Sequence, residues 1–419
     1  MKRSLMSQMR HEWRDNIWLV FGLTLVCLAI WFFGSALFLT LRDYFRPLGF
    51  EGDNVYVLDI GFHREGSPNY VEVEHPQEMN NADLKAILAG LRNNPNVEAA
   101  GFTQNGSPYQ VSFWGNNVRL RYPTPDSIFY MGNMRYISPE IVRVLKLKSH
   151  TGKDEDYIER KLEEGEMLVS HVDKEKMPDK DYEMRLAEEI VGQTVCGWDT
   201  TKIHRVADVI VKVRRNAYED MKDSGDLVFP IDESGDVTGS MDIMVRVKPG
   251  CGPKFRQDFE EKPEMSSQRN VYLRSCTALS DMRKSSERKQ DMEVRLYTVV
   301  IGFMLVIIFL GLLGTFWFRM QQRVGEIAIR RVCGASRSDI FRRVIIEGLV
   351  LLVGASVLVS IIGWIGIVKL GYDEKFTRID LLWLEVGTFV VVALGIVVSV
   401  AGPAWMAMRI NPAEAVKDE

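Results

Sequence analysis

Apolar residues are concentrated in four long runs, which divide the chain into membrane-length and polar segments. The runs cover residues 17–41, 296–318, 344–368 and 386–408. Each is long enough to cross a bilayer as a helix, because about 20 residues span the hydrocarbon core. A long polar segment, residues 42–293, separates the first run from the second. The pattern predicts four transmembrane helices, with one large aqueous domain between helices 1 and 2.

Within this polar segment, strand-like and helix-like patterns follow one another. Alternating apolar positions predict strands at Asn54–Phe62, Tyr70–Glu74, Val97–Thr103, Tyr109–Trp114, Met167–His171, Gln193–Gly197, His204–Arg214, Leu227–Pro230 and Met241–Lys248. Apolar positions three and four residues apart predict helices at Asn81–Arg92, Ser138–Leu147, Arg185–Ile190, Phe255–Lys262 and Ala278–Arg295. The charged stretch Lys153–Glu166 is expected as a helix or loop, and Thr124–Asn133 as a surface loop. The chain is therefore predicted to be an α+β membrane protein whose large α+β domain has two lobes.

The first sixteen residues carry an apolar stripe opposite a basic face, which predicts an amphipathic helix at the cytoplasmic surface. The alternative is the basic region of a cleaved signal peptide. Residues 17–41 favour a retained anchor, because the run is long enough to span and lacks an A-x-A type exit. The polar tail, residues 409–419, is expected in the cytoplasm as well.

The segment between the second and third runs, residues 319–343, is strongly basic. It carries seven arginines against only Glu326 and Asp339. Positive charge close to membrane spans is retained on the cytoplasmic side. This segment is therefore predicted to be a cytoplasmic loop, and residues 42–293 are predicted to lie outside the cytoplasm.

The same segment has the pattern of a helix, a break and a second helix. Glu326 and Arg330 are spaced to pair on a helix, with the acidic residue first. Gly334 can take the left-handed conformation that ends a helix, and Ser336 can cap the next one, with Asp339 completing an approximate capping box. Apolar contact surface is expected from Ile327, Ala328, Val332, Ile340, Phe341 and Val344. Two interpretations stay open: a solvated basic anchor, or a preformed docking element.

Composition and spacing exclude several other functions. The net charge of −4 gives no electrostatic basis for nucleic-acid binding. No P-loop, GxSxG or HExxH motif occurs, and the six histidines show no paired spacing. The carboxylates of residues 154–166 are interpreted as a solvated face rather than a metal site. The chain is thus predicted to be no enzyme and to hold no cofactor or metal, and a disulfide is left open among Cys196, Cys251 and Cys276.

Two motifs resemble a known family. Arg323–Ser336 (RVGEIAIRRVCGAS) is similar to the E-I-x-x-R-R-x-x-G-A-S signature of the MacB/FtsX/LolC permeases of ABC transporters. Gly402–Val416 (GPAWMAMRINPAEAV) resembles the closing motif of that family, with Val416 in place of the usual leucine. The arrangement of one span, a large outer domain and three further spans also resembles these permeases.

The resemblance implies a subunit that transmits the motion of a separate ABC ATPase to its outer domain in the bacterial inner membrane. MacB carries a fused ATPase, whereas this chain starts at its membrane helix, so the ATPase is expected in another polypeptide. A second permease chain, a periplasmic adaptor and the lipid membrane are the other expected partners, and the cargo class is peptides, drugs or lipoproteins. ATPase docking is assigned to Glu326, Ile327, Arg330, Arg331, Gly334, Ala335 and Ser336. The alternative is a signalling or scaffold protein that regulates an extracytoplasmic partner.

Overall fold

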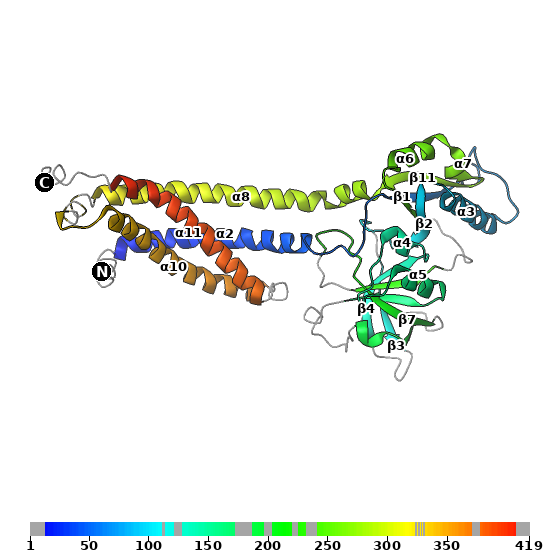
Figure 1. The fold of residues 1–419 in the computed structure, drawn as a ribbon, viewed down its shortest axis with the longest axis horizontal. Helices are drawn as coiled ribbons and strands as arrows, with labels where there is room; N and C mark the ends of the chain where they lie inside the picture. Colours follow the sequence, from blue (N-terminus) through cyan, green and yellow to red (C-terminus); the bar gives the residue numbers. More distant parts are fainter. Residues whose placement is uncertain are drawn as a thin grey trace. The chain divides into compact units, whose positions relative to one another are not determined.

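The computed structural model describes residues 13–110, 114–120, 128–171, 187–196, 203–219, 225–231, 241–322, 325, 327, 329, 332–370 and 378–407. The chain divides into two compact units, drawn in Figure 1. The helical unit comprises Met1–Arg42 and Asp291–Glu419, and the sheet unit comprises Asp43–Gln290. Each unit is described by itself below.

Four long helices form the helical unit and extend beyond the predicted spans: α2 (Trp13–Tyr44), α8 (Leu279–Gln322), α10 (Arg337–Leu370) and α11 (Arg378–Ala407). Residues 279–290 at the start of α8 belong to the sheet unit. Among the described residues, four helices are long and apolar enough to cross a membrane. α8 joins the predicted helix Ala278–Arg295 and the predicted span 296–318 into one element. No glycine or proline occurs in residues 279–301, so no helix-breaking residue lies near the point where the two meet.

A buried apolar core holds these helices together. It includes Cys27 from α2, Phe316 from α8, Leu352 from α10 and Ile396 from α11. Arg42 Nη1 lies 2.8 Å from Asp380 Oδ2, so an ion pair joins the last turn of α2 to the first turn of α11.

In the sheet unit, the described residues form one eleven-stranded sheet in the order β10-β11-β1-β9-β2-β4-β3-β6-β7-β5-β8. The strands are β1 (Val55–Phe62), β2 (Val97–Gln104), β3 (Trp114–Leu120), β4 (Ile128–Ile137), β5 (Met167–Ser170), β6 (Thr194–Cys196), β7 (Ile203–Ile210), β8 (Gly225–Pro230), β9 (Asp242–Val247), β10 (Ser267–Gln268) and β11 (Val271–Ala278). Because β4 also pairs with β8, the strands from β4 to β8 form a closed ring, while the strands from β10 to β2 form an open part. Two lobes were expected from the sequence, whereas the described strands form one continuous sheet within one compact unit.

Helices cover the sheet on both faces. They are α3 (Pro76–Arg92), α4 (Ile141–Leu145), α5 (Glu155–Glu163), the 3-10 helix η2 (Ala187–Ile190), α6 (Gly252–Glu261) and α7 (Pro263–Ser266). Alternate residues of β9 separate the two faces, as the two-residue period of a strand requires. Ile243 and Val245 pack with α3 and with Phe255 of α6, whereas Met244 packs with α4. Figure 1 shows α3, α6 and α7 beside the open part of the sheet.

Several sequence predictions are wrong. Tyr70–Glu74 is no strand, because the side-chain amide of Asn270 bonds both backbone groups of Val71 in place of a strand partner. Thr124–Asn133 was expected as a loop, but β4 begins at Ile128. The glycine and asparagine within β4 interrupt the alternation of apolar and polar residues that indicates a strand. β11 was not predicted, and Tyr109 has a positive φ rather than starting a strand.

Some predictions fall outside the described residues. They include most of the amphipathic N-terminal helix predicted for residues 1–16, of which the structure describes Trp13 onward as the start of α2. The predicted cytoplasmic tail, residues 409–419, lies outside them entirely.

Cys251 and Cys276 are both present as thiols, and burial raises the pKa of Cys276 to about 12.

Candidate functional site

The turn between α8 and α10 has the geometry that the sequence predicts. Gly334 has a φ of +94°, and no atom of the described residues lies within 4 Å of the position that a Cβ would take. The N–H of Cys333 donates to the Ile329 carbonyl at 2.9 Å, so helical bonding continues up to this glycine. A left-handed glycine directly after that bond ends the helix.

The capping box is also confirmed, and it starts α10. The Asp339 N–H donates to Ser336 Oγ at 3.1 Å, and the Ser336 N–H donates to Asp339 Oδ2 at 3.2 Å. The Ser336 hydroxyl donates to the same carboxylate oxygen at 2.7 Å. These reciprocal bonds satisfy backbone groups that have no partner inside a helix. The turn therefore has a defined shape while it stays at the surface.

The predicted docking residues divide into two environments. Gly334 and Ser336 are exposed and Ala335 is half-buried, so all three are accessible at the turn. Ile327 is buried in the core of the helical unit, which makes it a packing residue rather than a contact surface. Ile340 and Val344, which were also expected to offer contact surface, are buried in the same core. Glu326, Arg330 and Arg331 lie outside the described residues.

The first helix of the turn exposes an apolar strip, of which Val332 was an expected contact residue and Ile329 was not. Ile329 is 56% exposed and Val332 is 69% exposed, and they are three residues apart on one helix face. Cys333 beside them is exposed as well. The sequence does contain a sign of this strip. Ile327 and Ile329 are two residues apart, so they lie on different sides of a helix and cannot both face its core.

A second polar site lies in the sheet unit, at residues 211–219, called the junction loop here. Arg135 Nε lies 2.9 Å from Asp226 Oδ1, and both side chains are almost fully buried. The second oxygen of Asp226 accepts the Val213 N–H at 2.9 Å, and Arg135 also donates to the Val213 carbonyl. A buried ion pair is costly unless its remaining bonds are made, and here the backbone of the junction loop makes them.

Arg214 fastens the junction loop to the segment that follows α2. Its guanidinium is fully buried and donates to the carbonyls of Arg46, Ala217 and Glu219 at 2.7–3.1 Å. The backbone N–H of Arg214 donates to the Leu48 carbonyl at 2.9 Å. Burial lowers the pKa of Arg214, although the charge of Glu219 acts against this. Arginine keeps its proton in spite of such burial, so the loop is fixed by a buried positive charge.

The base of α8 meets the same loop. Glu287 is buried, and its carboxylate accepts the Ala217 N–H at 2.8 Å and Arg283 Nε at 2.9 Å. Gly49 is required nearby: its φ is +80°, and a Cβ there would lie 2.1 Å from the Lys212 carbonyl oxygen. The segment after α2, the junction loop and the base of α8 are therefore packed as one joint.

This joint has little signature in the sequence. Its charged residues come from β4, the junction loop after β7, β8 and α8, and only the fold brings them together. The one usable signal was the run VKVRR at Val211–Arg215, where charged residues continue a buried strand.

Comparison with known proteins concerns the C-terminal part of the chain. Residues 298–412 match the FtsX-like permease C-terminal family, and this range contains the whole α8–α10 turn. Proteins of that family are membrane components of ABC transporters rather than enzymes, and they associate with an ATPase subunit. The match indicates a permease subunit of the ABC-transporter type, and it supports the FtsX/MacB/LolC group that the motifs resemble.

Among solved structures, a similar chain is the extracellular domain of the noncanonic ABC-type transporter YknZ from Gram-positive bacteria. The similarity covers 52% of this chain and 100% of that chain, at 10% identity and a TM-score of 0.29. No curated protein sequence matches the chain.

Proposed function

We propose that the chain is a MacB-type permease subunit whose α8–α10 turn docks a separate ABC ATPase on the cytoplasmic face of the bacterial inner membrane. The sheet unit lies outside the cytoplasm, and ATP-driven motion of the helices reaches it. Two permease chains form the working dimer, and the cargo is a peptide, a drug or a lipoprotein on the outer face. The observation that carries the proposal is the defined turn from Gly334 to Asp339 inside the FtsX-like region.

The turn supports docking because it combines fixed shape, charge and apolar surface. The capping bonds hold Ser336 and Asp339 in one arrangement before any partner binds, and such preorganisation reduces the entropy lost on binding. Ile329 and Val332 add exposed apolar area. The surrounding arginines can pair with carboxylates of a partner in fixed geometry.

The joint of the sheet unit supports the mechanical part of the proposal. α8 is continuous from Leu279 to Gln322, so no flexible break interrupts it. Its base is bonded to the junction loop through Glu287, and Arg214 bonds the same loop to the segment after α2. Displacement of either helix would therefore act on the closed ring of strands through bonded contacts rather than through a loose linker.

The test is ATPase stimulation in purified complexes of this chain with the ATPase that co-purifies with it. We expect Glu326→Lys to abolish stimulation, because a misplaced charge inside an interface costs several kcal/mol, on the order of 2–5. Arg330→Lys keeps the charge but loses the planar fork, and it should weaken binding. The matched control is Gln321→Lys, which adds a positive charge at an exposed position of α8 outside the motif.

Topology is checked in the same variants by labelling single cysteines with an impermeant reagent in intact cells. Protection of position 336 and labelling of position 75 are expected. If Glu326→Lys and Arg330→Lys stimulate the ATPase as the parent does, the loop is only a topological anchor and the docking proposal is wrong. Ready labelling at position 336 would contradict the proposed orientation.

A further inference from the structure

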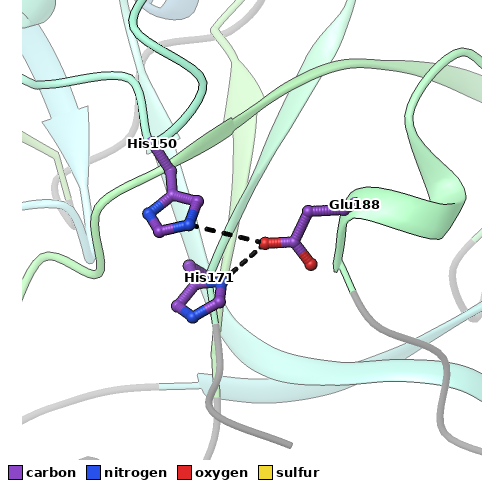
Figure 2. Close-up of side chains that lie close together, drawn as sticks. All are labelled: His150, His171 and Glu188. Carbon is purple, nitrogen blue, oxygen red and sulfur yellow. Dashed lines mark hydrogen bonds and ion pairs between the residues drawn. The ribbon is translucent and has the colours of Figure 1, made fainter.

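Three side chains with metal-binding chemistry converge in the sheet unit, far apart in sequence: His150, His171 and Glu188 (Figure 2). Each offers one ligand atom, and these atoms all lie within 4.8 Å of one another. Glu188 Oε1 lies 2.5 Å from His171 Nδ1 and 3.8 Å from His150 Nε2. The group could not be predicted from the sequence, because the spacing of the three residues matches no metal motif.

The closed ring of strands positions both histidines at the same end of β7. The His150 N–H donates to the Val209 carbonyl at 2.8 Å, and the His171 N–H donates to the adjacent Ile210 carbonyl at 2.9 Å. Their imidazole rings stack with centroids 4.0 Å apart and planes 11° apart. The backbone of each histidine is therefore fixed by the sheet, and the two rings stay together.

Further contacts hold the turn that carries His150. The buried carboxylate of Asp208 accepts the Ser149 hydroxyl at 2.6 Å and the Thr151 hydroxyl at 2.8 Å. Glu188 comes from the 3-10 helix η2, whose neighbours Ala187 and Ile190 are buried in the core of the ring. All three ligand residues thus stand on supported backbone, as a preformed site requires.

The donor atoms of the cluster suit a cation. Two imidazole nitrogens and one carboxylate oxygen can each offer a lone pair to a metal ion. The three side chains are 30–43% exposed, which leaves a path for an ion from solvent.

The donor atoms can reach one small divalent ion after side-chain rotation. Zinc binds imidazole nitrogen and carboxylate oxygen at about 2.0–2.2 Å, which places two tetrahedral ligands about 3.4 Å apart. The contact of 3.8 Å has to shorten slightly, and the contact of 2.5 Å has to open by about 1 Å, which rotation of the exposed Glu188 side chain can supply. One imidazole also has to turn out of the stack, because rings with planes only 11° apart cannot both aim an in-plane lone pair at one ion.

We propose that His150, His171 and Glu188 form a Zn²⁺ site on the sheet unit, with water in the fourth position. Two imidazoles and one carboxylate are a donor set that zinc prefers, whereas Mg²⁺ and Ca²⁺ prefer oxygen ligands alone. The ion fastens η2 to the ends of β5 and β7 and to the Ser149–Thr151 turn. A site of this kind is independent of ATPase docking, because it uses residues of the sheet unit only.

Calorimetric titration of ZnCl₂ into the full chain in detergent, freed of any affinity tag, tests the site. The parent should bind one Zn²⁺ per chain, and MgCl₂ should give no binding heat. His150→Ala and His171→Ala should each weaken zinc binding by at least about tenfold, the size of loss that even an outer-shell partner can cause. His75→Ala removes an exposed histidine outside the cluster and should leave binding unchanged.

A matched pair of carboxylates gives the second arm. Glu188→Gln should lose zinc affinity at least about tenfold, while Glu189→Gln changes the neighbouring exposed carboxylate and should bind like the parent. Co²⁺ in the parent should show the visible absorption of four-coordinate cobalt, and this band should be lost in His171→Ala. Absence of zinc binding in the parent would overturn the proposal, and so would equal affinity in the parent, Glu188→Gln and Glu189→Gln.

Discussion

The α8–α10 turn and the junction loop are both polar connections, but they are stabilised in opposite ways. At the turn, the polar contacts of Ser336 and Asp339 are exposed, and among the described residues no atom lies within 4 Å of the Cβ position at Gly334. At the junction loop, Arg214 and Asp226 are fully buried, and Gly49 is in direct contact with backbone. The first connection keeps its shape with a few local hydrogen bonds, and the second keeps it with desolvated charges.

This difference decides what each connection tolerates. An exposed cap contributes only about 1 kcal/mol to helix stability. When it breaks, its polar groups form hydrogen bonds with water, so the turn can exchange its own contacts for those of a partner at little cost. A buried charge left without its partner keeps the whole cost of desolvation. The turn is thus suited to reversible docking, and the junction loop is suited to a permanent joint.

The largest effect is expected at the buried pair of the joint. Asp226→Asn leaves Arg135 charged and buried without its counter-ion, which should cost about 3–5 kcal/mol of unfolding free energy. Hydrogen exchange of the β7 and β8 amides in the full chain measures this loss. Protection of the α10 amides should stay unchanged if the two connections are energetically independent.

The control for this substitution is an exposed ion pair of the same unit. Arg143 and Asp156 are 3.5 Å apart, with side chains 55% and 83% exposed. Asp156→Asn should cost well under about 1 kcal/mol, because exposed pairs contribute little. Comparable losses in Asp226→Asn and Asp156→Asn would show that burial does not set the cost, and the contrast between the two connections would fail.

A half-buried carboxylate sharpens the comparison, because it lies opposite an acid rather than beside an arginine. Asp242 pairs in register with Asp59 and accepts a hydrogen bond from Gln110. Burial, together with the charge of Asp59, raises the pKa of Asp242 to about 6. A folded-state pKa above the unfolded value stabilises the fold at low pH, and that contribution is lost as the pH rises through about 6.

The expected loss between pH 4 and pH 7 is about 2 kcal/mol, since one pKa unit corresponds to about 1.4 kcal/mol and an unfolded aspartate is already partly ionised at pH 4. Asp242→Asn cannot titrate, so β9 amides should be better protected at pH 7 than in the parent and equally protected at pH 4. Glu189→Gln, in an exposed carboxylate, should keep the pH profile of the parent. A parent whose β9 protection rises from pH 4 to pH 7 would contradict the assignment.

How far the sequence predicts this molecule depends on whether the signal is local. The four apolar helices, the left-handed Gly334 and the Ser336–Asp339 cap were all predicted, since each depends on residues within a few positions of one another. The strand at Tyr70–Glu74 was wrong because the partner of Val71 is a side chain about 200 residues away. Sheet order and the closure of β4 on β8 have no local signature.

The same limit applies to the functional groups. Arg135 and Asp226 are ordinary polar residues until the sheet brings them together. The same is true of His150, His171 and Glu188. Ile327 shows the converse case. Its place inside a motif suggested a contact with a partner, whereas its burial in the helical unit makes it a packing residue.

At the exposed turn, Gly334→Val should have a smaller effect than the buried substitutions. A β-branched residue at a φ of +94° is strained by about 1–2 kcal/mol, even though no atom obstructs its Cβ. ATPase stimulation should fall, while protection of the junction-loop amides stays as in the parent. Ala335→Ser alters the adjacent residue without that strain and serves as the control; equal stimulation in both variants would remove the role assigned to Gly334.

The smallest effect is expected for Ser336→Ala, which removes the acceptor for the Asp339 N–H and leaves the helix of α10 otherwise intact. Loss of a cap costs about 1 kcal/mol, and the freed N–H is exposed enough to bond water instead. Exchange should therefore rise only for the first amides of α10, at Asp339 and Ile340. Ser336→Thr keeps the hydroxyl and should exchange like the parent. If Ser336→Ala also lowered the protection of the β7 and β8 amides from exchange, the turn and the junction loop would be coupled in the folded state. The description of the two connections as independent would then be wrong.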